Sequence, residues 1–441
     1  MMQLPEKKLF LPLELTRREY FSKLLIAAEA FIRGYTVIFG HSAQVLSHAL
    51  NQNKPGILFY KSASPAKSEI FTRLKNAGNL IIAQDEEAGI IFKNYSEFFN
   101  LRQSLKNINN IDHFFCWGQD EYEFLSKTVC KNRSKEKLTL SGSPRTSLWG
   151  HLGETMFREE IAKYTKNYGN YILLVSNFVS PNPLVRDNNI DTGNLERENR
   201  NIKKFRELVA ILSKNGINTV IRPHPAENEG GWDDLTKLPY VFVKSTGDIT
   251  PLILGSKMVV HNSCTSGIQS VMSNKYVFSY GDKDELTNFM ASVPNIVSHI
   301  TDNSDEIIKR YRLIMKRGDR YKNNLEDKVN FLDKKIHMSG SNEPAKIILD
   351  KIEEKWFFSD KLDMNSIYLH SLAMKSIIKK LIHKFSINQK DKIVKGKQED
   401  MRKDRLLNDF KKSMTIQGGY KNFKMSIYHG KVAVFSHKIK D

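Results

Sequence analysis

Short apolar runs alternate with helical stretches through most of this chain, and this alternation restricts the folds that the chain can adopt. The first run spans Leu9–Leu15, and apolar residues then recur every three or four positions in Arg17–Arg33, which predicts a helix. Gly34 is typical of the end of such a helix. Strands that alternate with helices favour a parallel, doubly wound sheet. Further strands are expected directly after Gly34 and at Gly56–Tyr60, Asn79–Gln84, Asp112–Gly118 and Lys137–Gly142.

The same pattern starts again after Trp149. An apolar run at Tyr171–Phe178 precedes an expected helix at Arg197–Asn215, and four more short apolar runs follow. Each half of the pattern has the size of a domain. We therefore expect an α/β protein with two Rossmann-like domains, at 1–150 and 151–335, and a hinge near residue 150. One continuous large sheet is the alternative.

The remaining segment, 336–441, is expected to be a helical, basic C-terminal extension that ends in a β-hairpin around Tyr428–Lys431. The chain has 68 Lys and Arg against 49 Asp and Glu, and residues 375–441 alone hold 18 Lys and Arg against 6 Asp and Glu. Lysines recur at helical spacing between apolar residues in Met374–Phe385, so we expect this stretch to contact anionic lipid. A helix packed on a core with solvated lysines is the alternative.

The composition of the 441 residues excludes several classes of protein. With 40% hydrophobic residues the chain is not disordered as a whole. It has no uninterrupted apolar run of about 18 residues, and the apolar stretch within its first 15 residues is shorter than a signal peptide requires. We therefore expect a cytoplasmic protein whose basic tail can contact the inner face of the cytoplasmic membrane. Its three cysteines lack a CxxC pair and predict neither disulfides nor zinc. The net charge of +19 leaves a basic nucleic-acid-binding protein as an alternative of another class, which the concentration of charge in the tail disfavours.

An acidic cluster follows the fourth expected strand. Ligands of doubly wound sheets bind beyond the carboxyl ends of the strands, and Asp85, Glu86 and Glu87 lie at such an end. Crowding of three carboxylates raises the pKa of at least one, as a general base near neutral pH requires. Acidic residues that favour the N-terminus of a helix are an equally good interpretation.

Two strand ends of the second half carry groups that suit an anion. Arg222 and His224 follow one strand, with a proline on each side of the histidine, and can donate charge-assisted hydrogen bonds to a phosphate. Ser263, Thr265 and Ser266 follow another and offer hydroxyl and backbone N–H donors at the start of a helix. A surface histidine and simple N-capping are the alternatives.

Two weaker sites complete the set. Ser143 and Arg145 follow the last strand of the first half and resemble a glycine-turn anion site, although a structural turn is as compatible with these residues. Ser176 and Asn177 follow the first strand of the second half and are expected to face the same cleft.

Several of these segments, taken in order between Leu9 and Gly281, resemble the bacterial surface carbohydrate biosynthesis proteins of capsule and lipopolysaccharide assembly. The segments are LFLPLELTRREYFSKLLIAAEAFIRGYTVIFG, IIAQDEEAGI, FFCWGQDEYEFL, LSGSPRTSLW, IRPHPAE and HNSCTSGIQSVM. Their combination is similar to the CMP-sugar glycosyltransferases of the GT-B fold, which include sialyltransferases and Kdo transferases. The resemblance implies two Rossmann-like domains that face a central cleft, with the acceptor and the base on the first and the nucleotide sugar on the second.

The resemblance also implies an activity and roles for individual residues. The implied reaction is transfer of a CMP-activated ulosonic acid, such as Kdo or a nonulosonic acid, to a glycan or lipid-linked glycan acceptor. His224 would contact the donor phosphate and assist its departure, and the Ser/Thr cluster at 263–266 would contact the same phosphate. Glu86, with Asp85 next, would deprotonate the acceptor. No Asp-x-Asp motif stands at a strand end, so we expect no metal and no cofactor besides the nucleotide sugar.

Two related activities remain open from the sequence. One is a CDP-alditol phosphotransferase of the teichoic-acid type, which uses a similar His-Pro and Ser/Thr arrangement. The other is a UDP-sugar enzyme of the GT-B fold, such as a 2-epimerase-like protein.

Overall fold

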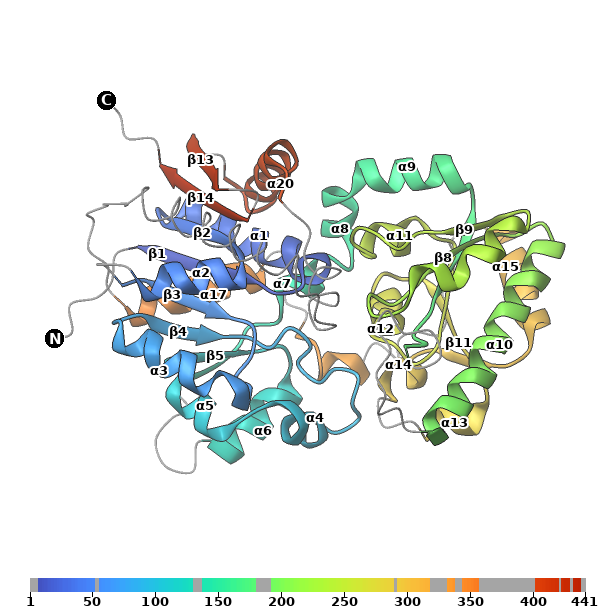
Figure 1. Cartoon of the computed structure of the whole chain (residues 1–441), viewed down its shortest axis with the longest axis horizontal. Coiled ribbons are helices and arrows are strands. Elements are labelled where there is room, and N and C mark those ends of the chain that lie inside the picture. The colour runs from blue at the N-terminus through green and yellow to red at the C-terminus, as the bar shows by residue number, and fades with distance from the viewer. Residues whose placement is uncertain are drawn as a thin grey trace, which may run out of the picture.

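Two α/β units lie side by side in the computed structural model of the chain, and each is built around its own sheet (Figure 1). The two separate sheets confirm the expected α/β fold with two Rossmann-like domains and exclude the single continuous sheet. The structure describes residues 7–51, 55–129, 137–179, 192–288, 292–317, 331–337, 343–356, 401–419, 422–428 and 431–437.

The first sheet has the strand order β13-β14-β2-β1-β3-β4-β5-β6. The pairs from β2 to β6 are parallel, whereas β14 pairs with β2 and with β13 in the antiparallel sense. Strands buried on both faces have nearly continuous apolar sequences, which explains why these runs were visible in the sequence. The bounds are β1 Lys8–Leu13, β2 Thr36–His41, β3 Ile57–Tyr60, β4 Leu80–Ala83, β5 His113–Cys116, β6 Leu138–Leu140, β13 Phe423–Tyr428 and β14 Val432–His437.

The second sheet is parallel throughout and has the order β12-β11-β10-β7-β8-β9. Renumbered within the unit, this is the order 3-2-1-4-5-6 of dinucleotide-binding domains, read from β9 to β12. The bounds are β7 Tyr171–Val175, β8 Asn218–Arg222, β9 Val241–Val243, β10 Met258–His261, β11 Tyr276–Tyr280 and β12 His299–Thr301.

Helices cover both faces of each sheet, and alternate residues of a strand enter different cores. In β1, Leu9, Leu11 and Leu13 pack with α1, whereas Phe10 packs on the opposite face with α2 and α3. The helices of the first unit are α1 Thr16–Ile32, α2 Ser42–Leu50, α3 Ser68–Asn76, α4 Tyr95–Arg102, α5 Leu105–Asn110, α6 Gln119–Val129, α7 Pro144–Ser147, α17 Glu343–Lys355 and α20 Lys403–Ile416, with a 3₁₀ turn at Pro65–Lys67.

Two helices lead into the second unit: α8 His151–Met156 lies between the units in Figure 1, and α9 Arg158–Tyr168 runs along the upper side of the second unit. Expected helices at Arg17–Arg33 and Arg197–Asn215 agree with α1 and α10 within a few residues. The other helices are α10 Thr192–Lys214, α11 Thr250–Gly255, α12 Thr265–Met272, α13 Lys283–Thr287, α14 Val293–Ile296 and α15 Ser304–Arg317, with a 3₁₀ helix at Glu229–Lys237.

The described part of the C-terminal segment packs on the first sheet. Phe410 of α20 stacks on Phe435 of β14 with ring centroids 3.8 Å apart, and both belong to the core that contains Phe31 of α1. Residues from both ends of the chain therefore share one core. The amphipathic stretch Met374–Phe385 lies outside the described residues, so lipid contact through it stays a prediction.

One hydrophobic core continues from one unit into the other. Trp117 and Trp149 of the first unit belong to the same buried cluster as Leu173 and Val259 of the second. The backbone N–H of Val293 also donates to the carbonyl of Ile91, at 3.0 Å. The two units are therefore packed directly against each other on one side.

Candidate active site

Each sheet has one topological switch point, which is the place between two neighbouring strands from which the chain continues in opposite directions across the sheet. Ligands of such sheets bind at this point, beyond the carboxyl ends of the strands. In the second sheet it lies between β7 and β10, and the segments that follow these strands hold Ser176, Asn177 and Ser263. In the first sheet the switch point lies between β1 and β3. Helix α1 follows β1, and Lys61 directly follows β3.

A cleft of about 610 Å³ is lined by residues that follow the strands at both switch points. Arg18 and Lys61 line it from the first unit, and His224 and Thr265 line it from the second. Three of the residues expected at the site, Asp85, Glu86 and Ser143, are absent from the described lining. The other nine line the cleft: Glu87, Arg145, Ser176, Asn177, Arg222, His224, Ser263, Thr265 and Ser266.

The N-terminus of α12 faces this cleft. Ser263 has a left-handed backbone, with φ of 51°, and its hydroxyl lies 2.9 Å from Asn295 Nδ2, which fixes the turn before the helix. Gly267 allows α12 to approach the buried ring of His261, because a Cβ at this position would lie 2.3 Å from Nε2. Helix N-termini attract anions through free N–H groups and the positive end of the dipole. This end of the cleft can therefore bind a phosphate.

The turn that carries His224 is held at the cleft by a buried carboxylate, Glu227, which was not among the residues expected from the sequence. Glu227 accepts hydrogen bonds from the backbone N–H groups of His224, at 3.2 Å, and Phe178, at 2.9 Å. Ser176 Oγ and Trp232 Nε1 donate to the same carboxylate. Glu227 thus joins the end of β7 to the end of β8.

The His224 ring has one nitrogen engaged within the turn. Its Nδ1 accepts the backbone N–H of Ala226, at 3.2 Å. A neutral ring with this contact carries its proton on Nε2. His224 is exposed and lines the cleft, so Nε2 is suited to donate a hydrogen bond to a bound oxyanion.

Arg222 has a different environment from the one expected. Its side chain is buried, and Nη1 donates to the carbonyls of Lys244, at 3.0 Å, and Thr246, at 2.8 Å. Nη2 donates to the carbonyl of Gly247. These contacts hold the loop after β9, which carries Asp248 into the cleft lining.

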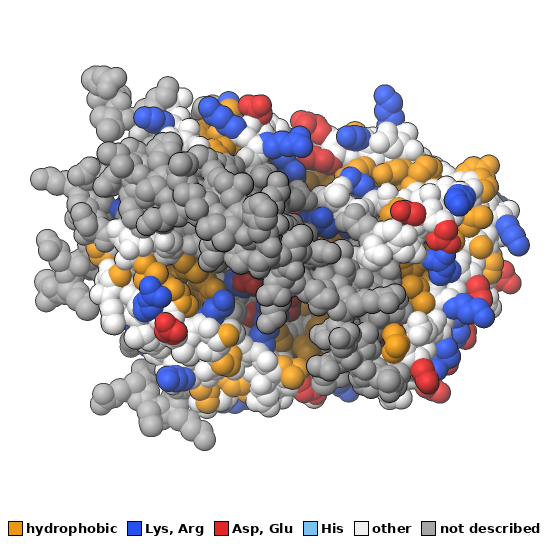
Figure 2. Space-filling view, viewed as in Figure 1, with side chains coloured by type: hydrophobic (Ala, Val, Ile, Leu, Met, Phe, Trp, Pro, Cys, Tyr) orange, Lys and Arg blue, Asp and Glu red, His pale blue; other side chains and the backbone are white. Residues whose placement is uncertain are grey.

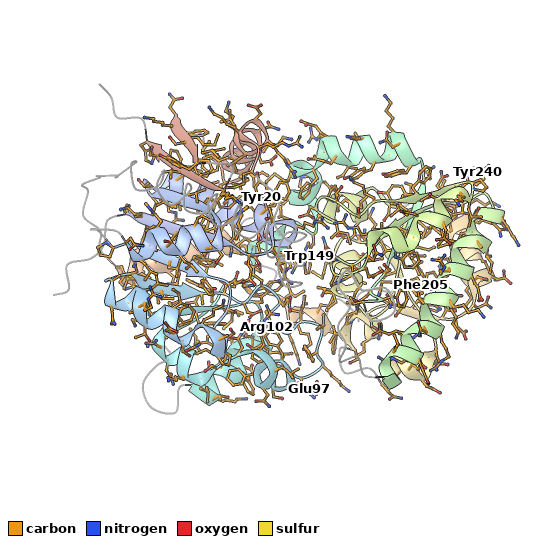
Figure 3. The ribbon with its side chains drawn as sticks, in the orientation of Figure 1. Tyr20, Glu97, Arg102, Trp149, Phe205 and Tyr240 are labelled. Carbon is orange, nitrogen blue, oxygen red and sulfur yellow. The ribbon has the colours of Figure 1, made fainter. Side chains whose placement is uncertain are left out.

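The opposite wall of the cleft is cationic. Arg18 and Arg102 both form ion pairs with Glu87. Arg145 donates to the Glu86 carbonyl, at 3.1 Å. Burial, and to a lesser extent the nearby Arg18, lowers the pKa of Arg145 to about 10, and the carboxylates of Glu86 and Glu87 oppose this effect. Arg102, labelled in Figure 3, lies on the part of the first unit near its boundary with the second.

The three carboxylates of the acidic cluster point to different surroundings. Asp85 is fully buried and accepts the Gln103 amide at 2.6 Å. Glu86 is buried and lies 3.4 Å from the ammonium group of Lys23. Burial raises the pKa of Asp85 and of Glu86, with Arg102 and Lys23 respectively opposing it. For Glu87 burial is outweighed by Arg18 and Arg102, which lower its pKa.

Ser143 has a local structural contact. Its hydroxyl caps α7 by accepting the backbone N–H of Arg145, at 3.2 Å, and its side chain is buried. The turn interpretation of this segment therefore accounts for Ser143, while its neighbour Arg145 reaches the cleft.

Other lining residues were not foreseen from the sequence. Asp248 is one, and its carboxylate accepts the Thr250 N–H at 2.7 Å. Burial raises the pKa of Asp248, and the hydrogen bonds from Thr250 oppose this effect. Arg17, Arg18 and Lys61 are further examples, and the rule that pointed to the remaining strand ends would have found them after β1 and β3.

The described residues contain no group of three or more His, Cys, Asp or Glu arranged to hold a metal ion. Within the same residues, no helix has the length and apolar character that crossing a bilayer requires. The expectation of a metal-independent reaction stays a prediction.

Comparisons with known proteins support the fold. The sequence matches no family model and no curated protein. The structure of UDP-GlcNAc 2-epimerase from Methanocaldococcus jannaschii, in complex with UDP-GlcNAc and UDP, covers 78% of this chain and 99% of its own at 11% identity and a TM-score of 0.51. A structure of the wall teichoic acid polymerase TagF with CDPG covers 80% of this chain and 90% of its own at 12% identity and a TM-score of 0.50. The chain therefore has the two-domain architecture of the GT-B fold.

Proposed function

We propose that this protein is a transferase that moves a nucleotide-activated sugar to an acceptor in bacterial surface glycan assembly. The observation that carries the proposal is the cleft itself, where the switch points of both units meet. The N-terminus of α12 and His224 lie on one wall, and Arg18, Arg102 and Arg145 lie on the other. A cleft with this charge suits a phosphate-bearing donor.

The donor phosphate belongs at the N-terminus of α12 in this proposal. Thr265 and Ser266 supply donors there, and His224 Nε2 adds a hydrogen bond that strengthens as negative charge develops on the leaving phosphate. Arg222 and Glu227 act on the ligand through the loops that they position.

Arg145 provides a reason to retain the CMP-activated ulosonic acid as donor. Such a donor has a carboxylate beside the anomeric carbon, and this carboxylate needs a cation besides those at the phosphate. Arg145 lines the cleft from the other unit, together with Arg18, Lys61 and Arg102. A charge-assisted hydrogen bond from its guanidinium to the sugar carboxylate would meet this need.

For the general base we propose Asp248 in place of the expected Glu86. Asp248 lines the cleft and has a raised pKa, whereas Glu86 is buried against Lys23 and is absent from the described lining. In the proposed step the acceptor oxygen bonds to the anomeric carbon and the bond from that carbon to the phosphate oxygen breaks. CMP leaves with the electron pair, and the hydroxyl proton passes to Asp248.

Transfer of an alditol phosphate from a CDP-alditol is the second candidate, and a UDP-sugar reaction is the third. Two fold neighbours favour them, because TagF was soaked with CDPG and the epimerase holds UDP-GlcNAc and UDP. A diphosphate donor would place a second phosphate toward the cationic wall. The same cleft could accommodate that charge.

A donor screen tests the proposal. CMP-Kdo, CMP-sialic acid, CDP-glycerol and UDP-GlcNAc are compared by thermal stabilisation and by release of the nucleotide. We expect the CMP sugars to give the largest shift, and His224→Ala to reduce it while the exposed control His151→Ala does not. If no cytidine or uridine nucleotide stabilises the protein, the proposed function is wrong.

The assignment of the base has its own test. Asp248→Asn keeps an oxygen for the Thr250 N–H but cannot accept the proton, so we expect kcat to fall by about 10²- to 10⁴-fold with nucleotide binding retained. Asp233→Asn, at an exposed position of the 3₁₀ helix Glu229–Lys237, is the control. If Glu86→Gln lowers kcat as much as Asp248→Asn and leaves the melting temperature unchanged, Glu86 is the base after all.

A further inference from the structure

A second cavity, of about 840 Å³, adjoins the cleft. The two cavities share Arg17, Phe21 and Asp248. The described lining of the second cavity comes from α1, α9, the loop after β9 and the segment that opens α20. Parts of both units and of the C-terminal segment therefore surround one space that leads to Asp248.

The charge of this second cavity is strongly positive. Its described lining has five cationic side chains, Arg17, Lys163, Lys244, Arg402 and Arg405, and one carboxylate, Asp248. Lys163 and Arg402 are exposed. Along the upper edge of Figure 2, over α20 and α9, Lys and Arg side chains stand among a few Asp and Glu.

Three of these cations have described contacts that hold them at the cavity. Arg17 Nη1 donates to the Ser245 carbonyl at 3.1 Å, and Lys244 Nζ donates to Thr246 Oγ1 at 2.7 Å. Arg405 lies 3.6 Å from Asp409, a carboxylate that also accepts the Tyr20 hydroxyl at 3.0 Å.

The same cavity has an apolar side. Tyr20, Phe21 and Met401 are buried and contribute to its lining, and the guanidinium carbon of Arg405 lies 5.8 Å from the centre of the Tyr20 ring. Cations beside aromatic and apolar surface suit a ligand that carries both charge and a carbon skeleton. An inorganic ion alone would not use the apolar side.

We propose that the second cavity binds the acceptor, and that this acceptor is an anionic carbohydrate with phosphate or carboxylate groups along its chain. The inference rests on the proposed function, because it places the end of the acceptor at Asp248, where the cavity meets the donor cleft. It also gives the segment from Met401 to Arg405 a part in acceptor binding.

Binding of defined oligomers to the full-length protein tests this inference. Labelled hexamers of glycerol phosphate and of galacturonate are titrated by fluorescence anisotropy, with maltohexaose as the neutral reference. The variant Lys163→Gln/Arg402→Gln removes two cavity cations, and Lys166→Gln/Lys403→Gln removes two exposed lysines on the same elements that are absent from the described lining. We expect the first variant to weaken binding about three- to tenfold, and the second to leave it unchanged.

The two anionic hexamers identify the charged group of the acceptor, and tighter binding of either one than of maltohexaose supports the inference. Equal binding of all three oligomers overturns it, as does equal affinity of the two variants. Thermal stabilisation by nucleotides is measured on the same proteins. The two measurements are separate. Absence of nucleotide stabilisation in the wild type counts against the proposed function, whereas equal binding of the hexamers counts against the inference about the acceptor.

Discussion

Glu227 links the segments that follow β7 and β8, on the side of the cleft where we propose that the donor binds, and its substitution tests how the cleft is built. The carboxylate accepts hydrogen bonds from Ser176, Phe178, His224 and Trp232. Glu227→Gln keeps the shape of the side chain but replaces one acceptor oxygen by an amide group that only donates. At one of these contacts the substitution therefore places the amide N–H group against another hydrogen-bond donor, and that hydrogen bond is lost.

The structure indicates which contact is lost and about how much it contributes. Glu227 Oε1 accepts the two backbone N–H groups, so the amide oxygen is expected to remain on that side. The amide nitrogen then faces Trp232 Nε1–H, whose contact with Oε2 is 3.0 Å. The serine hydroxyl can rotate to accept, but the buried indole N–H cannot. An unpaired buried donor costs about 1–3 kcal/mol, so we expect Glu227→Gln to destabilise the protein by about 2 kcal/mol.

A double-mutant cycle, with unfolding by urea at neutral pH, measures the cost of leaving the Trp232 indole N–H without an acceptor. Trp232→Phe removes the indole donor, so Glu227→Gln should cost about 1–2 kcal/mol less in the Trp232→Phe background than in the wild type. The exposed control Glu196→Gln should change stability by less than about 0.5 kcal/mol. An equal cost of Glu227→Gln in both backgrounds would refute the reasoning, because the lost stability would then not come from the indole contact.

Four further predictions follow from single features. Burial raises the pKa of Glu121 to about 8 from 4.5, so between these pH values the folded state holds a proton that the unfolded state has lost. The free energy of unfolding should therefore fall as the pH rises from about 4.5 to 8. Urea titrations at several pH values measure this slope, and Glu121→Gln should flatten it. Gly267→Ala should push α12 away from His261 and weaken nucleotide stabilisation, whereas Gly230→Ala, whose Cβ meets nothing closer than 3.5 Å, should not. Turnover should be undiminished in excess chelator. Replacing the four lysines between 375 and 384 by glutamine should reduce sedimentation with vesicles that contain phosphatidylserine.

The strands could be predicted from the sequence, but the partner of the last hairpin could not. Each buried strand is a local apolar run, and the run expected at Leu9–Leu15 became β1 at Lys8–Leu13. Pairing of β14 with β2 joins residues about 400 positions apart, at Val434 and Ile38. No local period encodes such a pair. The two strands approach each other closely at Gly40, because a Cβ at this position would lie 2.1 Å from the carbonyl oxygen of Lys431.

The site could be predicted where a strand end carried an unusual group, and it was missed where the group was ordinary. His224 and the Ser/Thr cluster at 263–266 follow short strands and line the cleft as expected. Arg17 and Arg18 begin the helix expected at Arg17–Arg33, directly after the run expected at Leu9–Leu15, and two arginines at the start of a helix carry no sequence signal for a cleft. Glu227 is a single acid in a loop, and only its burial and four partners reveal its role.

The acidic cluster shows that a pKa argument from sequence neighbours alone is incomplete. The pKa of Asp85 is raised, and Glu87 contributes to this as expected, but burial is the larger cause. The prediction that crowding raises a pKa counted three carboxylates on one segment. The structure adds the cations of other elements, with Lys23 of α1 beside Glu86 and Arg102 of α4 beside Glu87. Coulombic effects depend on distance in space and on burial, so Glu87 has a lowered pKa although its neighbours are acids, and burial dominates the raised pKa of Glu86. A general base must combine a raised pKa with access to the cleft, and a rule based on adjacent carboxylates tests neither condition.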